Sequence, residues 1–205
     1  MNMINKLSRK HINSKNRKKL KNKNFSLISS NCNGSFILHD LGLKFLSPTI
    51  NLWMEPKDYI KFLQNLNYYI NLELSFSDTD EEKIGYPVGI LGDIKIYFQH
   101  YETRKEAKNK WLDICKRINY ENLYIMFTDR DGCTYDDIKE FDNLPYRNKV
   151  IFVNKQYPEI KSSFYIKGFE NMSSVGICSL FENKFSGKRY YDQFPYVKWF
   201  NGELY

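Results

Sequence analysis

The apolar residues of the chain gather in short runs that predict β-strands. Four runs have strand length and are rich in branched and aromatic side chains; they lie at residues 25–30, 123–127, 149–153 and 164–166. The run at 123–127 is almost uninterrupted, as in a strand that is buried on both faces. Residues 88–98 alternate apolar and polar side chains and predict a further strand, and residues 50–53 predict a short one.

Segments with apolar residues at helical spacing, or with helix caps ahead of them, separate these runs. They cover residues 36–43, 56–70, 107–118 and 134–141. Thr103 followed by Glu106 has the spacing of a capping box, in which each side chain satisfies a free backbone amide. The acidic residues 78–82 show no apolar face, and we expect a surface loop there.

The alternation of strands with helices of about 10–15 residues predicts a layered α/β/α fold with a mostly parallel central sheet. Residues 1–23 are polar and basic, and we expect them to form a loosely amphipathic basic helix or a frayed arm, with a solvated helix as the structural alternative. Residues 24–205 form a single α/β domain in this prediction, because the core pattern begins at Phe25. Deletion of the arm should then leave the body folded.

Charge is distributed unevenly along the chain. The net charge is +7, yet the first 23 residues hold nine of the 31 Lys and Arg residues and no acidic one. A basic segment of this kind can bind phosphates or an anionic membrane surface. The remainder is close to neutral and lacks the broad positive face of a nucleic-acid-binding fold.

The cysteines and the apolar runs indicate the cellular compartment in which the protein is expected. The four cysteines do not have the spacing of zinc ligands, and they are too sparse for a disulfide scaffold. No apolar run reaches the length of about 18 residues that a membrane span needs, and no apolar stretch of a secretory signal follows the first basic residues. We therefore expect a cytoplasmic protein, with peripheral attachment at the inner membrane face as an alternative.

Candidate chemistry gathers in three loops that each lead from a predicted strand into a predicted helix. These loops are residues 31–34, 100–102 and 129–133. In open α/β sheets, ligands bind beyond the carboxyl ends of the strands, and free amides at helix starts favour anions. If the three strands are parallel, Asn31, His100 and Asp129 line one cleft.

Asp129 and Asp131 form a DxD pattern directly after a buried strand. Two carboxylates at a strand end can hold Mg²⁺ or Mn²⁺, and the cation can hold a diphosphate. The pattern resembles the DxD element of nucleotide-sugar glycosyltransferases. Residues 129–134 also resemble the nucleophile motif of haloacid-dehalogenase-type phosphatases, in which Asp129 would attack phosphorus. A plain turn capped by an aspartate is the structural alternative.

Two cysteines lie at predicted helix starts. That position would lower the pKa of the Cys32 and Cys133 thiols. With His100 or His39 as base, either cysteine could be the nucleophile of an acyl transfer, and a packed structural cysteine is the alternative. His39 lies beside Asp40 and is expected to form a structural pair with it, so His100 is the stronger candidate for the base.

The candidate residues fall into three groups. His100 and Asp129 are the catalytic candidates, and Asp129 with Asp131 would bind the divalent cation. The candidates for contacts to a cofactor or substrate are Asn31, Cys32, Gly34, Glu102 and Arg130.

Several separated blocks of the sequence resemble a bacterial family, domain of unknown function nineteen-nineteen, whose members are often labelled exopolysaccharide biosynthesis proteins. The blocks lie in order between residues 25 and 166; among them are 30–32, 41–49, 58–63, 86–89 and 129–131, with His100, Glu106 and Trp111. The chain departs from the family at residues 33–35, where Trp-Gly-Gly is expected, and at His39 and Asp40. The resemblance implies a cytoplasmic bacterial protein of capsule or surface-polysaccharide assembly and supplies no reaction.

Three functions follow from these observations. Asp129 and Asp131 favour a metal-assisted sugar transferase that takes a glycosyl group from a nucleotide-sugar. His100 as base supports the alternative of an acyltransferase that modifies a sugar hydroxyl. The third hypothesis is a non-catalytic partner of a polysaccharide-synthesis complex, docked at an anionic membrane by its basic arm.

Overall fold

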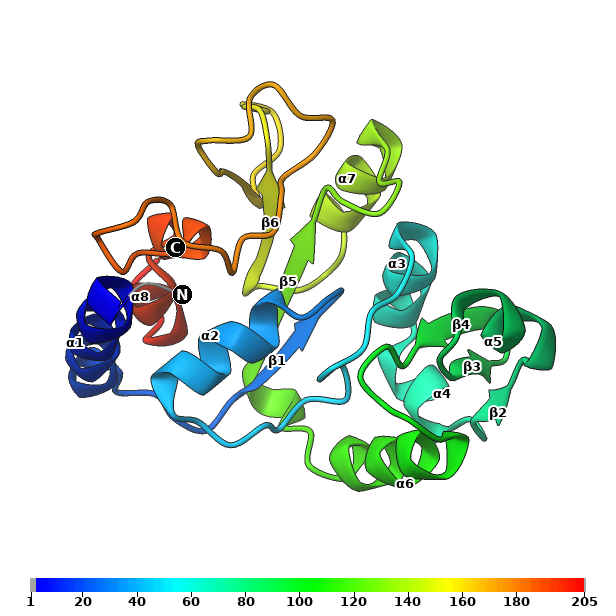
Figure 1. Ribbon diagram of the computed structural model, residues 1–205. Coiled ribbons are helices and arrows are strands. Elements are labelled where there is room, and N and C mark those ends of the chain that lie inside the picture. Colours follow the sequence, from blue (N-terminus) through cyan, green and yellow to red (C-terminus); the bar gives the residue numbers. More distant parts are fainter. Residues whose placement is uncertain (1–2, 205) are drawn as a thin grey trace.

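A four-stranded parallel sheet lies at the centre of the computed structural model, which describes residues 3–204. Its strands are β1 (Ser26–Ser29), β5 (Leu123–Thr128), β6 (Lys149–Val153) and β7 (Ser163–Tyr165), and they stand in that order (Figure 1). All three neighbouring pairs run parallel. The predicted layered α/β class with a mostly parallel sheet is confirmed.

Both faces of this sheet are buried, which explains the uninterrupted apolar run of β5. Successive side chains of a strand point to opposite faces. Ile125 and Phe127 therefore pack into one apolar cluster, whereas Tyr124 and Met126 pack into the other. Neither face of β5 meets solvent, so no polar residue is needed between the apolar ones.

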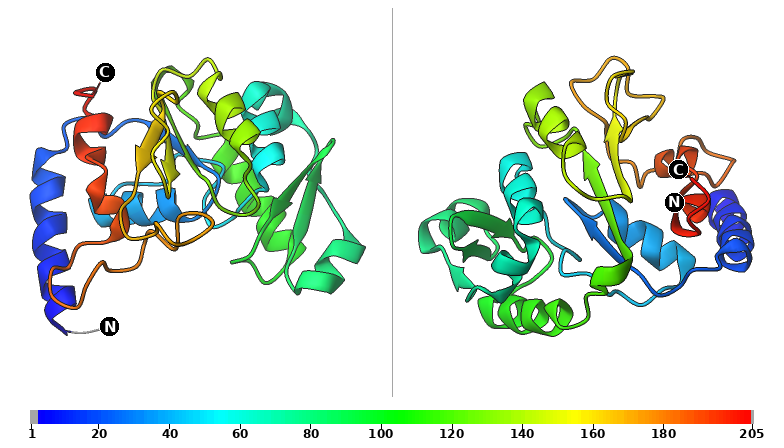
Figure 2. Two further views of the ribbon diagram at one scale, coloured as in Figure 1. Left: turned by 90° about the horizontal axis from the view of Figure 1, so that it is seen from above. Right: turned by 180° about the vertical axis from the view of Figure 1, so that it is seen from behind.

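Helices cover the two faces (Figures 1 and 2). On one side lie α3 (Pro56–Gln64) and α7 (Tyr135–Asp142), whose apolar residues share a cluster with Ile125 and Phe127. On the other side lie α2 (Asn33–Leu41) and α8 (Tyr196–Phe200), and α1 (Met3–Lys19) packs outside α2. None of the described helices is long and apolar enough to cross a bilayer.

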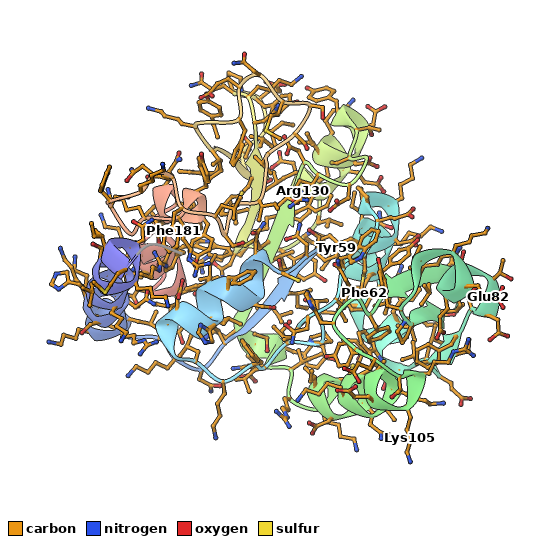
Figure 3. All side chains as sticks on the ribbon, in the orientation of Figure 1. Tyr59, Phe62, Glu82, Lys105, Arg130 and Phe181 are labelled. Carbon is orange, nitrogen blue, oxygen red and sulfur yellow. The ribbon has the colours of Figure 1, made fainter. Side chains whose placement is uncertain are left out.

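Tyr59 of α3 ties the first two strands of the sheet together. Its buried hydroxyl lies 3.0 Å from the carbonyl oxygens of both Ile28 and Met126. Figure 3 shows Tyr59 at the centre of the molecule, where α3 meets the sheet. The contact fixes α3 at the carboxyl half of β1 and β5, beside the loops that carry the candidate chemistry.

A second, antiparallel sheet lies beside the parallel one. It contains β2 (Ser75–Phe76), β3 (Val88–Leu91) and β4 (Ile94–Tyr97). The prediction of one strand over 88–98 is therefore wrong: Gly92 has a positive φ of 59°, and the chain turns there into a hairpin. The alternation of apolar and polar residues continues through the turn and conceals it.

The remaining elements lie between and around the sheets. They are α4 (Leu66–Asn71), α5 (Asp78–Ile84), α6 (Arg104–Cys115) and the 3₁₀ turns Tyr120–Asn122 and Tyr190–Gln193. The predicted helix 56–70 is divided at Asn65. Residues 78–82 were expected to be a loop but begin α5, because Ser77 caps the Asp80 amide and acidic residues favour a helix start.

The helix α1 packs firmly on the body. Arg9 is buried and donates to Asp40 at 2.6 Å, and it also pairs with Asp192. Asn5, also buried, donates to the Asn183 carbonyl oxygen at 2.9 Å. The folding of the body without residues 1–23 stays a prediction, and these contacts argue against it because they reach the carboxyl-terminal segment.

Candidate functional site

A cysteine and a histidine meet at the carboxyl end of β1. Cys32 stands at the N-cap of α2, in the loop that follows β1. Its Sγ lies 3.4 Å from the Nε2 of His100, which follows β4. The two residues are 68 positions apart in the chain. This is the pairing of thiol and imidazole that nucleophilic catalysis by cysteine uses.

The structure positions His100 beside Cys32 in a way that the sequence did not indicate. Its strand belongs to the antiparallel sheet, so the assumption that all three loops leave parallel strands is wrong. Residues 53–54 join the two sheets instead. Trp53 exchanges two backbone hydrogen bonds with Tyr97, at 3.0 and 2.9 Å, and the Met54 amide donates to the Ser30 carbonyl at 3.1 Å. The end of β4 is thereby fixed beside the end of β1.

Asn31 and Gly34 shape the loop around Cys32. The Asn31 amide nitrogen donates to Thr128 Oγ1 at 2.8 Å, and its Oδ1 accepts the Asn33 amide at 3.2 Å. The loop is thus held against the end of β5. A Cβ on Gly34 would lie 2.7 Å from the Ser29 Cβ, so glycine permits the close packing of α2 on β1. Both predicted cofactor contacts have a structural role in the loop.

Polar groups without a partner are concentrated around this loop, from the end of β1 to the first turn of α2. Buried side-chain atoms that lack a hydrogen-bond partner among residues 3–204 are few, and four of the nine lie within residues 29–35. They belong to Ser29, Ser30, Asn33 and Ser35. A buried, unpaired polar group costs about 1–3 kcal/mol, so the junction of β1 and α2 keeps polar side chains at an energetic cost, although these four atoms are shielded from solvent. The sequence reasoning missed these residues, although polar side chains at a strand-to-helix junction gave the signal.

Arg130 adds a positive charge to the site. It follows β5, is half-buried, and makes no side-chain hydrogen bond or ion pair within the described part of the chain. Figure 3 shows it at the end of β5. Burial raises the pKa of the Cys32 thiol, and the Arg130 charge offsets part of that rise. A free guanidinium beside the thiol can stabilise negative charge on sulfur or on a bound anion.

The expected thiolates at the two helix starts are not found. The pKa of Cys32 is raised rather than lowered, because burial outweighs the nearby positive charge. Burial also raises the pKa of Cys133 strongly, and the carboxylates of Asp137, Asp129 and Asp131 add to the rise. Cys133 therefore has no support as a nucleophile, and Cys32 needs its histidine partner to lose the proton.

Asp129 is an acceptor for two distant backbone amides. It is 6% exposed. Its Oδ1 accepts the Val175 amide at 2.7 Å, and its Oδ2 accepts the Asn154 amide at 2.8 Å. Burial raises the pKa of Asp129, and these two hydrogen bonds oppose the rise. The carboxylate therefore holds two loops to the end of β5, and its role as catalytic group or metal ligand stays a prediction.

The proposed cation site receives no further support from the geometry. Asp131 is exposed and has a positive φ of 60°, as in a turn. Between residues 3 and 204, no group of three or more His, Cys, Asp or Glu side chains is arranged to hold a metal ion. Binding of Mg²⁺ or Mn²⁺ by Asp129 and Asp131 stays a prediction.

Replacing Asp129 with Asn should destabilise the fold, whereas Asp131→Asn should not. The amide group of the introduced asparagine would face one of the two backbone amides that the carboxylate now accepts. We expect a loss of about 1–3 kcal/mol in the free energy of unfolding, against less than about 0.5 kcal/mol for Asp131→Asn. Urea unfolding with and without Mg²⁺ or Mn²⁺ measures both. Equal losses would contradict the structural role of Asp129. Stabilisation of the wild type by metal that Asp131→Asn abolishes would favour the metal site.

Two further candidates take no part in the contact between Cys32 and His100. Glu102 is exposed, and its side chain makes no hydrogen bond or ion pair to any residue that the structure describes. His39 is on α2 with its side chain 81% exposed, 4.0 Å from an oxygen of Asp40. Asp40 is bound instead by Arg9 and Tyr191, so the expected His39–Asp40 pair is at most a weak one.

The fold and the site together define an α/β protein with a cysteine–histidine pair at the carboxyl edge of a parallel sheet. The chain belongs to the family described as domain of unknown function (DUF1919), whose sequence model matches residues 3–201. It is also 49% identical over 199 residues to an uncharacterised protein of Haemophilus influenzae, covering 97% of this chain and 94% of that protein. The family resemblance drawn from the sequence is confirmed.

Proposed function

We propose that this protein is a cysteine-dependent acyltransferase, with Cys32 as nucleophile and His100 as general base. The observation that carries the proposal is the 3.4 Å contact between the Cys32 Sγ and the His100 Nε2. This distance is within the reach of a proton transfer between the two side chains. The alternative of acyl transfer therefore has more support than the transfer of a glycosyl group.

The first half-reaction loads the acyl group onto the protein. Nε2 of His100 takes the proton of the Cys32 thiol as the sulfur attacks the carbonyl carbon of a thioester or activated ester. The carbon–sulfur bond to Cys32 forms, the bond to the leaving group breaks, and the imidazolium returns its proton to that group. Because burial raises the pKa of the thiol, the base is needed during the attack.

The second half-reaction transfers the acyl group to a hydroxyl. The hydroxyl gives its proton to His100 while its oxygen attacks the carbonyl carbon of the acyl-Cys32 thioester. The thioester bond breaks, and the departing sulfur recovers the proton from the imidazolium. A sugar hydroxyl is the acceptor we propose, in line with the surface-polysaccharide role that we inferred from the sequence resemblance.

The surroundings of Cys32 suit the charge that develops in both steps. The amides of Gly34 and Ser35 belong to the first turn of α2, where the helix supplies no acceptor for them. An oxyanion on the attacked carbon can accept hydrogen bonds from such amides. Arg130 supplies a positive charge on the opposite loop. These groups support the proposal without defining the donor.

Intact-protein mass spectrometry tests the proposal directly. We expect p-nitrophenyl acetate or acetyl-coenzyme A to add one acetyl group to the wild type, on Cys32. Cys32→Ser should abolish the rapid adduct, whereas Cys133→Ser, which removes the other half-buried cysteine at a helix start, should leave it. A wild type without an adduct, or an adduct that Cys32→Ser retains, would contradict the proposal and favour the non-catalytic partner.

The metal-assisted sugar transferase stays as the second candidate. The observation that favours it is the exposed Asp131 next to Arg130, at the same edge of the sheet as Cys32. A cation bound by an exposed carboxylate can complete its coordination shell with water molecules and substrate phosphates. Calorimetry with nucleotide-sugars, with and without Mn²⁺, distinguishes the two candidates: metal-dependent binding that Asp131→Asn abolishes would favour glycosyl transfer.

A further inference from the structure

We propose that the outward face of α1 is a docking surface for an anionic lipid bilayer. This surface consists of the exposed lysines of α1 and the exposed apolar side chains at its first turns. It lies at the outer edge of the molecule, away from α6 and the antiparallel sheet (Figures 1 and 2). The inference is independent of the proposed acyl transfer.

Among residues 3–204, no acidic side chain forms an ion pair with the lysines on this face. Lys15, Lys18 and Lys19 are exposed, and within the described chain none of the three makes an ion pair. They line a groove of about 640 Å³ between α1 and the α8 segment, to which Lys188 and Lys198 contribute from the other wall. The groove thus presents converging positive charges to the solvent.

Two acids in the groove do not cancel this charge. Asp192 is already paired with the buried Arg9, and Glu203 is paired with Lys21 at 3.3 Å. A second groove on the other flank of α1 is also basic, with Lys10 and Lys23, and shares Lys18 with the first. Lys18 therefore stands on the ridge between two positively charged grooves.

Apolar side chains continue the same face toward the start of the helix. Met3 and Leu7, one helical turn apart, are 74% and 62% exposed. Phe185 is 68% exposed and comes from the neighbouring loop, whose carbonyl at that residue accepts a hydrogen bond from Ser8 at 3.4 Å. Large apolar groups beside lysines are typical of a surface that enters the headgroup region of a membrane.

The buried side of α1 makes this face a preformed surface. Arg9 anchors the helix through Asp40 and Asp192, and Asn16 donates to the Tyr196 hydroxyl at 2.8 Å. Residues on the opposite side of the helix are thereby held outward together. Membrane binding then requires little ordering of the backbone, so little of the binding free energy is lost to conformational entropy.

The chemistry fits a bilayer better than a nucleic acid. Exposed Met3, Leu7 and Phe185 would gain nothing from a phosphate backbone, whereas they leave water when they enter a lipid interface. Most of the exposed basic residues of α1 are lysines, which act as point charges toward lipid phosphates. Arg17, also exposed, donates to the Asp40 carbonyl oxygen at 2.9 Å. A nucleic acid or a soluble phosphate is an outcome that the test distinguishes.

Sedimentation of the full chain with lipid vesicles tests the surface. We expect binding to vesicles of phosphatidylcholine with phosphatidylglycerol, little binding to phosphatidylcholine alone, and weakening by salt. The triple variant Lys15→Gln, Lys18→Gln, Lys19→Gln should lower the partition coefficient about 100-fold, since each lysine contributes about a factor of five. Leu7→Trp should show a blue-shifted emission when these vesicles are added.

A matched variant on the far side of the molecule serves as the control. Lys105→Gln, Lys110→Gln, Lys116→Gln removes the same charge from exposed positions in and directly after α6 and should retain nearly full binding. Equal losses in the two triple variants would show that only net charge matters and would overturn the proposal. So would an unbound wild type, or binding that inorganic phosphate or RNA abolishes at constant ionic strength.

Discussion

Replacing His100 with Gln should slow acylation of Cys32 about 10²–10⁴-fold, the usual contribution of a positioned general base. Glutamine can still form a hydrogen bond to the thiol, but it cannot take up its proton. Because burial raises the pKa of Cys32, the unassisted thiol should supply little thiolate near neutral pH. The rate of adduct formation, followed by intact mass, measures the effect.

A histidine elsewhere on the surface provides the control for this prediction. His39 lies on α2 with its side chain 81% exposed, and His39→Gln should acylate at the wild-type rate. His100 is also exposed, so neither substitution should change the thermal midpoint. An undiminished rate in His100→Gln would remove the histidine from the mechanism. An equal loss in both variants would point to a general effect of the substitution.

Replacing Arg9 with Met should lower the free energy of unfolding by about 3–5 kcal/mol, as expected when one partner of a buried ion pair is removed. The variant leaves Asp40 and Asp192 buried, with side chains 6% and 8% exposed, and removes the guanidinium that pairs with both, while Arg189 remains 3.7 Å from Asp40. Lys10→Met changes the same charge one residue further along α1, at an exposed position, and should cost less than about 0.5 kcal/mol. Urea unfolding followed by circular dichroism compares them.

The same network should make the stability sensitive to acid. Burial raises the pKa of Asp40, but the hydrogen bond from Tyr191 and the charge of Arg9 outweigh the effect of burial, so the pKa is lowered overall. A carboxyl with a lowered folded-state pKa stabilises the protein above its unfolded pKa, and that contribution is lost as the pH falls through the folded value. Arg9→Met should therefore lose less stability on acidification than the wild type. A parallel fall in both proteins would contradict the network.

Local patterns in the sequence were sufficient to predict the strands of the central sheet. They did not predict the turn of the hairpin or the short exposed helix α5. The runs at 123–127 and 149–153 coincide with β5 and β6, because burial on both faces leaves a continuous apolar stretch. The hairpin at Gly92 was missed, because the apolar–polar alternation continues through it. The helix α5 was missed because its residues are exposed or half-buried, so it has no apolar stripe to reveal it.

The packing of α1 could not be deduced from its composition. A segment with nine basic residues and no acid indicates a solvated helix or arm. Arg9 is the exception among those residues, since it is buried against Asp40 and Asp192. The two aspartates come from distant parts of the chain, and nothing in residues 1–23 shows that they are there.

By itself, the sequence determined the fold class, the family and the loops in which chemistry could lie, since these depend on residues that are close along the chain. Only the tertiary structure decided which polar side chains are free to react. Cys32 meets His100 because residues 53–54 pair with the ends of both β1 and β4. Asp129 is not free to react, because its carboxylate accepts hydrogen bonds from the amides of Asn154 and Val175. In both cases the deciding partner is a backbone segment far away in the sequence, and backbone amides carry no sequence signature.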